Sequence, residues 1–228
     1  MSIWPVLGWN PYEEDAVRDL ILKMSISIDG FVGGPDGGIT WVFDSDQEAT
    51  AWTVETVSNA SLHIMGSRTF HDMAAYWPTS TDVFAPPMNQ ITKAVFSRQG
   101  PAILKNVTTT TALKDARANA ATGRTGTLQA GAESWAQAYV ASGDLVEEVA
   151  KLKAQEGRPI VAHGGASFAR SLVAQGLVDQ IALLVHPVAL GKGLPIFSEL
   201  SSPARLKLTS SRAFPGGSVA HVYRAAGA

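Results

Sequence analysis

Three short segments contain residue types that bind phosphate, and each one follows an apolar run. They are Gly164-Gly165-Ala166-Ser167, Gly66-Ser67-Arg68-Thr69 and Ser97-Arg98. Residues with small side chains let a ligand approach the backbone N–H groups at the start of a helix, while hydroxyl and guanidinium groups add donors that suit phosphate oxygens. Each segment by itself is more typical of a tight turn or a solvated strand end. Together they favour a dinucleotide, which offers a pyrophosphate and, in NADP, a further 2′-phosphate.

A fourth segment could form a pocket for a planar heterocycle. It begins with Asp29 at the end of an apolar run, continues through a glycine-rich loop, and reaches Trp41 and Asp46. The carboxylate of Asp46 could accept hydrogen bonds from a substrate ring, which makes it the candidate catalytic residue. Trp41 is more typical of the core or of a pocket wall than of a reactive group.

Asp46 also has a structural interpretation. Aspartate is common in the first turn of a helix because it opposes the helix dipole. We expect a helix to start near Ser45, which has capping-box spacing with Glu48. Ser45 would then cap the helix and leave Asp46 freer to bind a ligand. Asp44 with Gln47 is an alternative capping pair.

The sequence lacks the motifs of several other protein classes. It contains neither the P-loop pattern G-x-x-x-x-G-K-[ST] nor G-x-G-x-x-G, and the absence of a G-x-S-x-G elbow gives a hydrolase little support. There is no cysteine and the five histidines are scattered, so we expect no metal site. His163 and His186 lie within or beside apolar runs and are more typical of core residues than of acids or bases.

The composition is that of an ordinary globular protein. Of 228 residues, 46% are apolar and 17% are charged, and 18 Lys+Arg against 20 Asp+Glu give a net charge of −2. Because no basic run is present, we expect no nucleic-acid partner. The N-terminal apolar run is short and broken by Pro5 and Pro11. We therefore expect neither a signal peptide nor a membrane span, and a cytoplasmic location.

Strand-like and helix-like segments alternate along most of the chain. The expected strands are the apolar runs at 20–28, 62–65, 93–97, 159–162 and within 177–190. Helices are expected after Ser45, from Gly66 to Pro78, from Asp144 to Gly157 and from about Phe168 to Gly176. The alternation predicts an α/β fold with a mostly parallel sheet covered on both faces. Residues 204–212 and 218–224 flank Pro215-Gly216-Gly217 and predict a C-terminal antiparallel hairpin.

The remaining segments are harder to assign to elements. Pro86 and Pro87 predict a loop before the strand at 93–97, and the Thr-, Ala- and Gly-rich residues 107–132 are interpreted as an insertion. Residues 1–17 form an N-terminal arm. Because no linker or step in composition divides the rest, we expect residues 18–228 to form one domain.

The C-terminal third carries the clearest family pattern. Ile160-Val161-Ala162-His163-Gly164-Gly165, Gly176-Leu177-Val178-Asp179 and His186-Pro187-Val188 before Leu190-Gly191-Lys192-Gly193 together resemble the reductase-type domain of riboflavin biosynthesis, a member of the dihydrofolate reductase-like superfamily. The segments 27–31 and 66–69 are similar to the first strand and first phosphate-binding helix of that family. The resemblance covers residues 18–98 and 144–224.

The resemblance implies a three-layer α/β/α fold with eight or nine strands, NADPH across the strand ends, and a homodimer. It makes Gly164, Gly165, Ala166 and Ser167 the pyrophosphate turn, with Gly66, Ser67, Arg68 and Thr69 as a second phosphate contact and Ser97-Arg98 as the selector for the 2′-phosphate. Asp46 follows Trp41 by five residues, where folate enzymes place their substrate-binding carboxylate. Ser27, Asp29 and Trp41 become substrate contacts. Ser67 departs from the basic residue common in the folate enzymes.

Two functional hypotheses follow from these residues. The first is a reductase that transfers hydride from NADPH to a C=N or C=O group of a pteridine-like or ribosylaminopyrimidine substrate. The alternative is a nucleotide-binding or regulatory homodimer that has kept the cofactor site but lost turnover. Binding of NADPH without reduction of any substrate would distinguish the second from the first.

Overall fold

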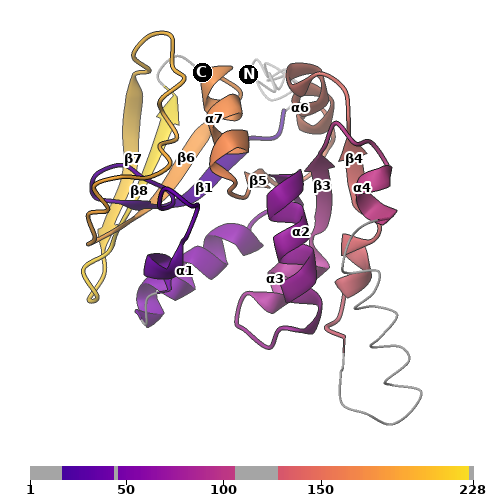
Figure 1. The fold of residues 1–228 in the computed structure, drawn as a ribbon, viewed down its shortest axis with the longest axis horizontal. Helices are drawn as coiled ribbons and strands as arrows, with labels where there is room; N and C mark the ends of the chain where they lie inside the picture. The colour runs from indigo at the N-terminus through magenta and orange to yellow at the C-terminus, as the bar shows by residue number, and fades with distance from the viewer. Residues whose placement is uncertain (1–16, 44–45, 106–127, 226–228) are drawn as a thin grey trace, which may run out of the picture.

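The computed structural model describes residues 17–43, 46–105 and 128–225 (Figure 1). The described strands are β1 (Leu20–Ser27), β2 (Leu62–Gly66), β3 (Thr92–Phe96), β4 (Tyr139–Ala141), β5 (Ile160–Ala162), β6 (Gln180–His186), β7 (Leu206–Ala213) and β8 (Val219–Ala225). The α-helices are α1 (Gln47–Ser58), α2 (Ser67–Tyr76), α3 (Ala85–Gln90), α4 (Ala102–Lys105), α6 (Leu145–Lys153) and α7 (Ala166–Ala174). Short 3-10 helices span Thr40–Val42, Trp77–Thr79 and Ala132–Trp135.

All eight strands form one sheet in the order β4-β3-β2-β5-β1-β6-β8-β7. Neighbouring strands from β4 to β6 are parallel, whereas β8 runs antiparallel to both β6 and β7. The predicted mostly parallel sheet with a C-terminal antiparallel hairpin is therefore confirmed. Because the carboxyl ends of parallel strands meet at one edge, the turns that follow β1, β2, β3 and β5 lie near one another.

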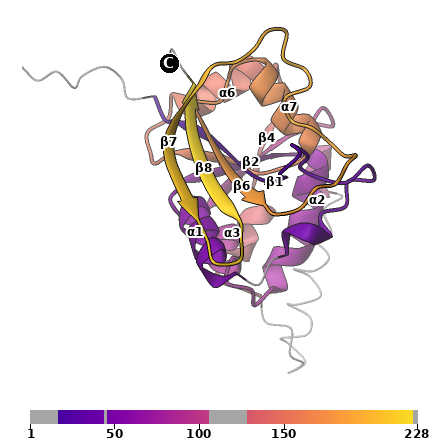
Figure 2. The same ribbon diagram turned by 90° about the vertical axis from the view of Figure 1, so that its left-hand side faces the viewer.

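Helices cover both faces of the sheet, which gives the predicted three layers. Figure 2 shows α6 and α7 on one side of the strands and α1 and α3 on the other. On the first side, strand residues such as Leu22 pack with Leu152 of α6 and Leu172 of α7. On the second side, Val57 of α1 packs against Ile21, and further along the sheet α2 and α3 cover a second cluster.

Parts of the chain expected to be irregular are ordered. Pro86 and Pro87 lie in the first turn of α3 rather than in a loop, because the missing proline N–H groups are not needed there. The three-residue strand β4 was not expected. Within the expected insertion, Ala132 is buried and begins the 3-10 helix that ends in the fully buried Trp135. The rest of that insertion at 107–127 and the arm at 1–16 lie outside the described residues.

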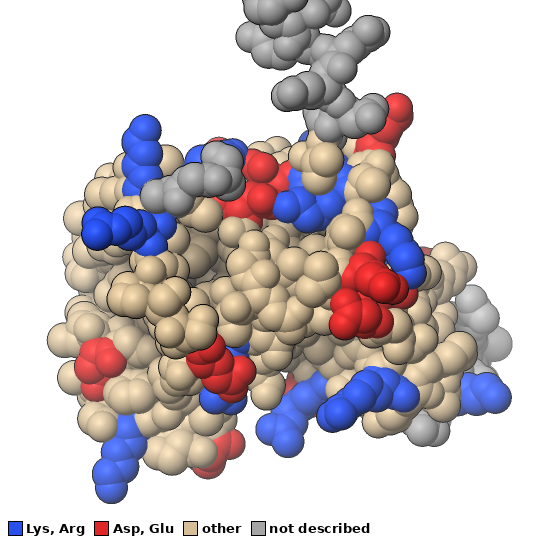
Figure 3. All heavy atoms as spheres, turned by 90° about the horizontal axis from the view of Figure 1, so that it is seen from above, with Lys and Arg blue, Asp and Glu red and all other residues tan. Residues whose placement is uncertain are grey.

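Two features of the surface bear on the expected partners. No described helix is long and apolar enough to cross a membrane. Seen from above, Lys and Arg side chains are interspersed with Asp and Glu side chains on the visible face (Figure 3). This face therefore carries no extended field of one sign of the kind that binds a phosphate backbone.

Candidate functional site

The three predicted phosphate-binding turns lie on adjacent strands. Gly66–Thr69 follows β2, Ser97-Arg98 follows β3 and Gly164–Ser167 follows β5, and these strands are neighbours in the order β3-β2-β5. In Figure 1 the start of α2 lies close to the end of β5 and the start of α7. The structure thus brings the three segments together along one edge of the sheet, although they are up to about a hundred residues apart in sequence.

The helices that begin at two of these turns differ from the others at their N-termini. Asp46 caps α1 and Asp144 caps α6, each with a carboxylate that accepts two backbone N–H groups. In contrast, the N-cap residues of α2 and α7 are Gly66 and Gly165, and no described side chain caps either helix. The N–H groups of a first helical turn have no partner within the helix. At α2 and α7 they are therefore available to an anion.

Direct contacts hold these two turns together. The Oγ1 of Thr69 donates a hydrogen bond to the Gly164 carbonyl oxygen at 2.9 Å. Gly165 has a φ of +95°, and a Cβ there would lie 2.8 Å from Thr69 Oγ1. A Cβ on Gly66 would lie 3.2 Å from the Cβ of Phe168. Glycine is needed at position 165 for both its conformation and its space.

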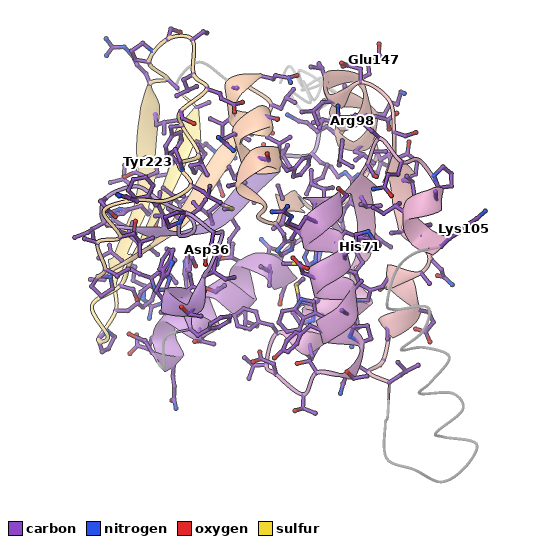
Figure 4. All side chains as sticks on the ribbon, viewed as in Figure 1. Asp36, His71, Arg98, Lys105, Glu147 and Tyr223 are labelled. Atoms are coloured by element: carbon purple, nitrogen blue, oxygen red, sulfur yellow. The ribbon has the colours of Figure 1, made fainter. Side chains whose placement is uncertain are left out.

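The third turn presents one exposed and one buried residue. Ser97 is buried, its N–H donates to the Ala141 carbonyl of β4, and its Oγ accepts from the N–H of Gln99. Arg98 is exposed and lies near the end of β3 and helix α6, well away from Asp36 of the glycine-rich loop (Figure 4). Its guanidinium can therefore reach a ligand at this edge.

Asp46 is the N-cap of α1, so the expectation that Ser45 caps this helix is wrong. Asp46 Oδ1 accepts the N–H groups of Glu48 and Ala49 at 2.9 and 3.1 Å. The alternative cap, Asp44, and Ser45 itself lie outside the described residues. Asp46 caps the helix because its backbone is extended, with φ −70° and ψ 106°. This conformation points the carboxylate at the second and third N–H groups of the helix.

The C-terminal hairpin adds a third partner to this carboxylate. Asp46 Oδ2 accepts the N–H of Gly216 at 2.5 Å, and a Cβ on Gly216 would lie 2.7 Å from the same oxygen. The hydrogen bonds from Ala49 and Gly216 hold the pKa of Asp46 below its ordinary value. Asp46 is therefore an ionised hydrogen-bond acceptor whose position is fixed by α1 and the hairpin.

Ser27 and Asp29 are bonded to each other and to a neighbouring loop. Ser27 Oγ donates to Asp29 Oδ1 at 2.6 Å and accepts the N–H of Phe31. The Asp29 carboxylate also accepts the N–H groups of Leu190 and Gly191. These hydrogen bonds lower the pKa of Asp29, and the bond from Ser27 has the largest effect. The pair joins the end of β1 to the loop after β6, and its contact with a substrate remains a prediction.

Trp41 is positioned against the end of β6. Its ring meets His186 edge-on, with 5.4 Å between the ring centroids. Its Nε1–H is buried and has no partner among the described residues. A buried N–H without an acceptor is costly, so this group is suited to donate to a bound ligand.

Two basic residues on the same face of the sheet were not identified from the sequence as site residues. Lys23 of β1 and His163, directly after β5, each follow the last paired residues of the two strands, Leu22 and Ala162. Burial lowers the pKa of Lys23 to about 8. Burial also holds the pKa of His163 well below its ordinary value, and the charges of His63 and Lys23 act in the same direction. The signal for Lys23 was that it is the only charged residue in a mostly apolar strand.

The buried ring of His163 packs against a second histidine, His63. Its ring lies edge-on to His63, with 4.4 Å between centroids, and its Nε2 has no partner within the described residues. The His63 Nε2 is paired with the Val57 carbonyl of α1, and burial lowers the pKa of His63 to about 4. Both rings are therefore neutral at pH 7.

A large hollow of about 570 Å³ lies elsewhere. It is lined by Ile21 and Gln180 near the amino ends of β1 and β6, by Trp52 of α1, and by Asn59, which follows that helix. None of the predicted site residues lines it. Among the described residues there is also no group of three or more His, Asp or Glu side chains that could hold a metal ion.

The sequence matches the family model described as the RibD C-terminal domain over residues 18–220. The chain belongs to this family. The uncharacterized protein YyaP of Bacillus subtilis (strain 168) is 28% identical over 207 residues, which cover 90% of this chain and 94% of YyaP. The match spans the fold from β1 into β8, so it includes all three turns and Asp46.

Solved structures give the same fold. A putative riboflavin biosynthesis protein from Shewanella sp. PV-4 superposes with a TM-score of 0.64 at 17% identity, covering 91% of this chain and 99% of that one. A dihydrofolate reductase from Enterococcus faecalis, complexed with NADP(H) and RAB-propyl, superposes with a TM-score of 0.54 at 12% identity, covering 91% and 96%. The dihydrofolate reductase-like fold class is therefore confirmed.

Proposed function

We propose that the protein is an NADPH-dependent reductase that transfers hydride to a C=N or C=O group of a pteridine-like or ribosylaminopyrimidine substrate. When bound, NADPH supplies the hydride. The protein holds the reacting groups in place and excludes water, and such positioning contributes about 7 to 11 kcal/mol in favourable cases. The family membership supports this class of reaction.

One observation carries the proposal. The starts of α2 and α7, which follow the adjacent strands β2 and β5, have no side-chain cap among the described residues, unlike α1 and α6, and Thr69 joins their turns. Two uncapped helix starts next to each other suit the two phosphates of a dinucleotide. Gly165 supports the close packing of the two turns, because its φ is +95° and a Cβ there would lie 2.8 Å from Thr69 Oγ1.

We assign the 2′-phosphate of NADPH to Ser97-Arg98. The two residues end β3, the strand next to β2, and Arg98 is exposed. Arginine offers a planar fork of donors that matches a phosphate monoester. The absence of a basic residue at Ser67 makes Arg98 and Arg68 the cations that would distinguish NADPH from NADH at this edge.

Substrate would lie beyond the turn at Gly164-Gly165, over β1 and β6. There Asp46 is an ionised acceptor and the Trp41 Nε1–H is a donor. The bonds to Ala49 and Gly216 make the Asp46 carboxylate a poor proton donor. Lys23, whose pKa of about 8 leaves it mostly protonated at neutral pH, or solvent would supply the proton that accompanies hydride transfer.

The test has a binding arm and a turnover arm. In the first, thermal unfolding is followed with NADPH and with NADH, and NADPH at about 100 times its Kd should add about 2.7 kcal/mol of stability. In the second, NADPH absorbance is followed with dihydrofolate and with ribosylaminopyrimidines. Binding with reduction of one of these substrates supports the proposal, whereas no response to NADPH in the first arm contradicts it.

The alternative function is a nucleotide-binding or regulatory homodimer. It predicts the same stabilisation by NADPH but no oxidation of NADPH with any of the substrates. For either function we expect a homodimer in the cytoplasm, and light scattering coupled to size-exclusion chromatography measures the first of these expectations directly.

A further inference from the structure

Thr69 uses its hydroxyl group within the protein. Its Oγ1 donates to the Gly164 carbonyl oxygen, 95 residues further along the chain, at 2.9 Å. A threonine hydroxyl has a single hydrogen to donate. While this bond exists, the Thr69 hydroxyl cannot also donate to a phosphate oxygen.

The bond joins two turns that follow different strands at the same edge of the sheet. Gly66–Thr69 belongs to β2 and α2, and Gly164–Ser167 belongs to β5 and α7. The Thr69 side chain also lies against Gly165, where a Cβ would be 2.8 Å from its Oγ1. Gly66 packs on Phe168 in the first turn of α7. The hydrogen bond from the Thr69 hydroxyl holds a backbone carbonyl of the second turn against the first.

We propose that Thr69 is a positioning residue that sets the two turns at the spacing a pyrophosphate requires, acting through Gly164 rather than by contact with the phosphate. The inference rests on the proposed function, because it concerns how the same site recognises its dinucleotide. The affinity for a ligand that spans both turns depends on their spacing. The affinity for a ligand that reaches only the neighbouring Ser97-Arg98 turn does not.

The experiment compares variants that remove or keep the hydroxyl. Thr69→Val keeps the shape of the side chain without its donor, Thr69→Ala is a second variant without the hydroxyl, and Thr69→Ser keeps the donor. Thr92→Val is the matched control, because Thr92 Oγ1 also donates to a distant carbonyl, that of Ser61, at 2.9 Å, but at the amino end of β3.

Two ligands and one ligand-free measurement serve as readouts. Isothermal titration gives the Kd for NADPH and for adenosine 2′-monophosphate, which lacks the pyrophosphate. Loss of one hydrogen bond predicts a Kd for NADPH about three- to tenfold higher in Thr69→Val and Thr69→Ala. Thr69→Ser and Thr92→Val should bind NADPH as the unaltered protein does, and adenosine 2′-monophosphate should bind all variants equally. Without ligand, amide exchange at residues 164–169 should be faster in the two variants without the hydroxyl.

The outcomes separate the inference from the function. Failure of the unaltered protein to bind NADPH overturns the proposed function and the inference with it. If the unaltered protein binds NADPH and Thr69→Val and Thr69→Ala bind it equally well, the inference is wrong and the function stands. Weaker NADPH binding with unchanged amide exchange at 164–169 also overturns the inference, because Thr69 would then act by direct contact with the ligand.

Discussion

The conformation of Gly165 gives a sharp prediction. Gly164 and Gly165 follow β5, but only the second has a positive φ, of +95° with a ψ of 99°. A Cβ at position 165 would lie 2.8 Å from Thr69 Oγ1. At position 164 the same atom would meet only the Met24 side chain, at 3.5 Å, which is an ordinary contact. Alanine substitutions at the two positions therefore form a matched pair.

The magnitude follows from the strain. A non-glycine residue held in such a backbone region costs about 1 to 3 kcal/mol, and displacing the Thr69 hydroxyl removes a hydrogen bond worth about 1 kcal/mol. We expect Gly165→Ala to lower the free energy of unfolding by about 2 to 4 kcal/mol. For a chain of this size each kcal/mol shifts Tm by roughly 2 to 4 °C. Gly164→Ala should change stability by less than about 1 kcal/mol.

The assay is urea unfolding of both variants without ligand, followed by titration with NADPH. Gly165→Ala should be the less stable variant and should bind NADPH more weakly, because relief of the strain moves the N–H groups at the start of α7. Equal stabilities for the two variants would refute the conformational argument. A destabilised Gly165→Ala that binds NADPH normally would refute the placement of the pyrophosphate at this turn.

The further predictions concern three single side chains. Arg98→Ala should raise the Kd for NADPH about tenfold and leave that for NADH unchanged; equal effects on both, by titration, would remove the 2′-phosphate from this site. Asp46→Ala should cost about 1 kcal/mol as a lost helix cap. The pKa of Asp46 is lower in the folded chain than its ordinary value of 3.8. Its carboxylate therefore stabilises the fold fully above pH 3.8 and loses this effect as the pH falls through the folded pKa. Urea unfolding between about pH 2 and 6 should accordingly show a smaller dependence of stability on pH for Asp46→Asn than for the unaltered protein. Burial lowers the pKa of Lys93 from 10.5 to about 7, so the unfolded chain holds the extra proton between these values and stability rises with pH from 7 to 10.5. Lys93→Met should remove that rise, and an unchanged slope in urea unfolding would show that Lys93 is not the group responsible.

The local patterns of the sequence were sufficient for most of the fold. Apolar runs bounded by glycine or helix caps gave β1, β2, β3 and β5, and Asp144 caps α6 as its spacing with Glu147 predicts. The loop predicted at Pro86 and Pro87 was wrong, because proline ends a helix from within but is tolerated in its first turn. Strand β4 has three residues, too few for any periodicity to show.

The candidate site could be predicted from the sequence where it depends on backbone turns, but not where it depends on tertiary contacts. The three turns could be found because glycine and hydroxyl residues after apolar strands mark helix starts. The third partner of Asp46 comes from Gly216, 170 residues away, and no local pattern encodes that bond. The same holds for Thr69, whose acceptor lies on another strand. Lys23 could have been found, since a lone charge in a buried strand needs a reason.

The central claim is that the turns after β2, β3 and β5 together bind NADPH. Hydrogen exchange measured by mass spectrometry, with and without NADPH, tests it most directly. We expect slower exchange at residues 66–70, 97–99 and 164–169 when NADPH is bound, and little change around the hollow beneath α1 formed by Trp52 and Asn59. Protection confined to that hollow, or absent from all three turns at saturating NADPH, would contradict the account.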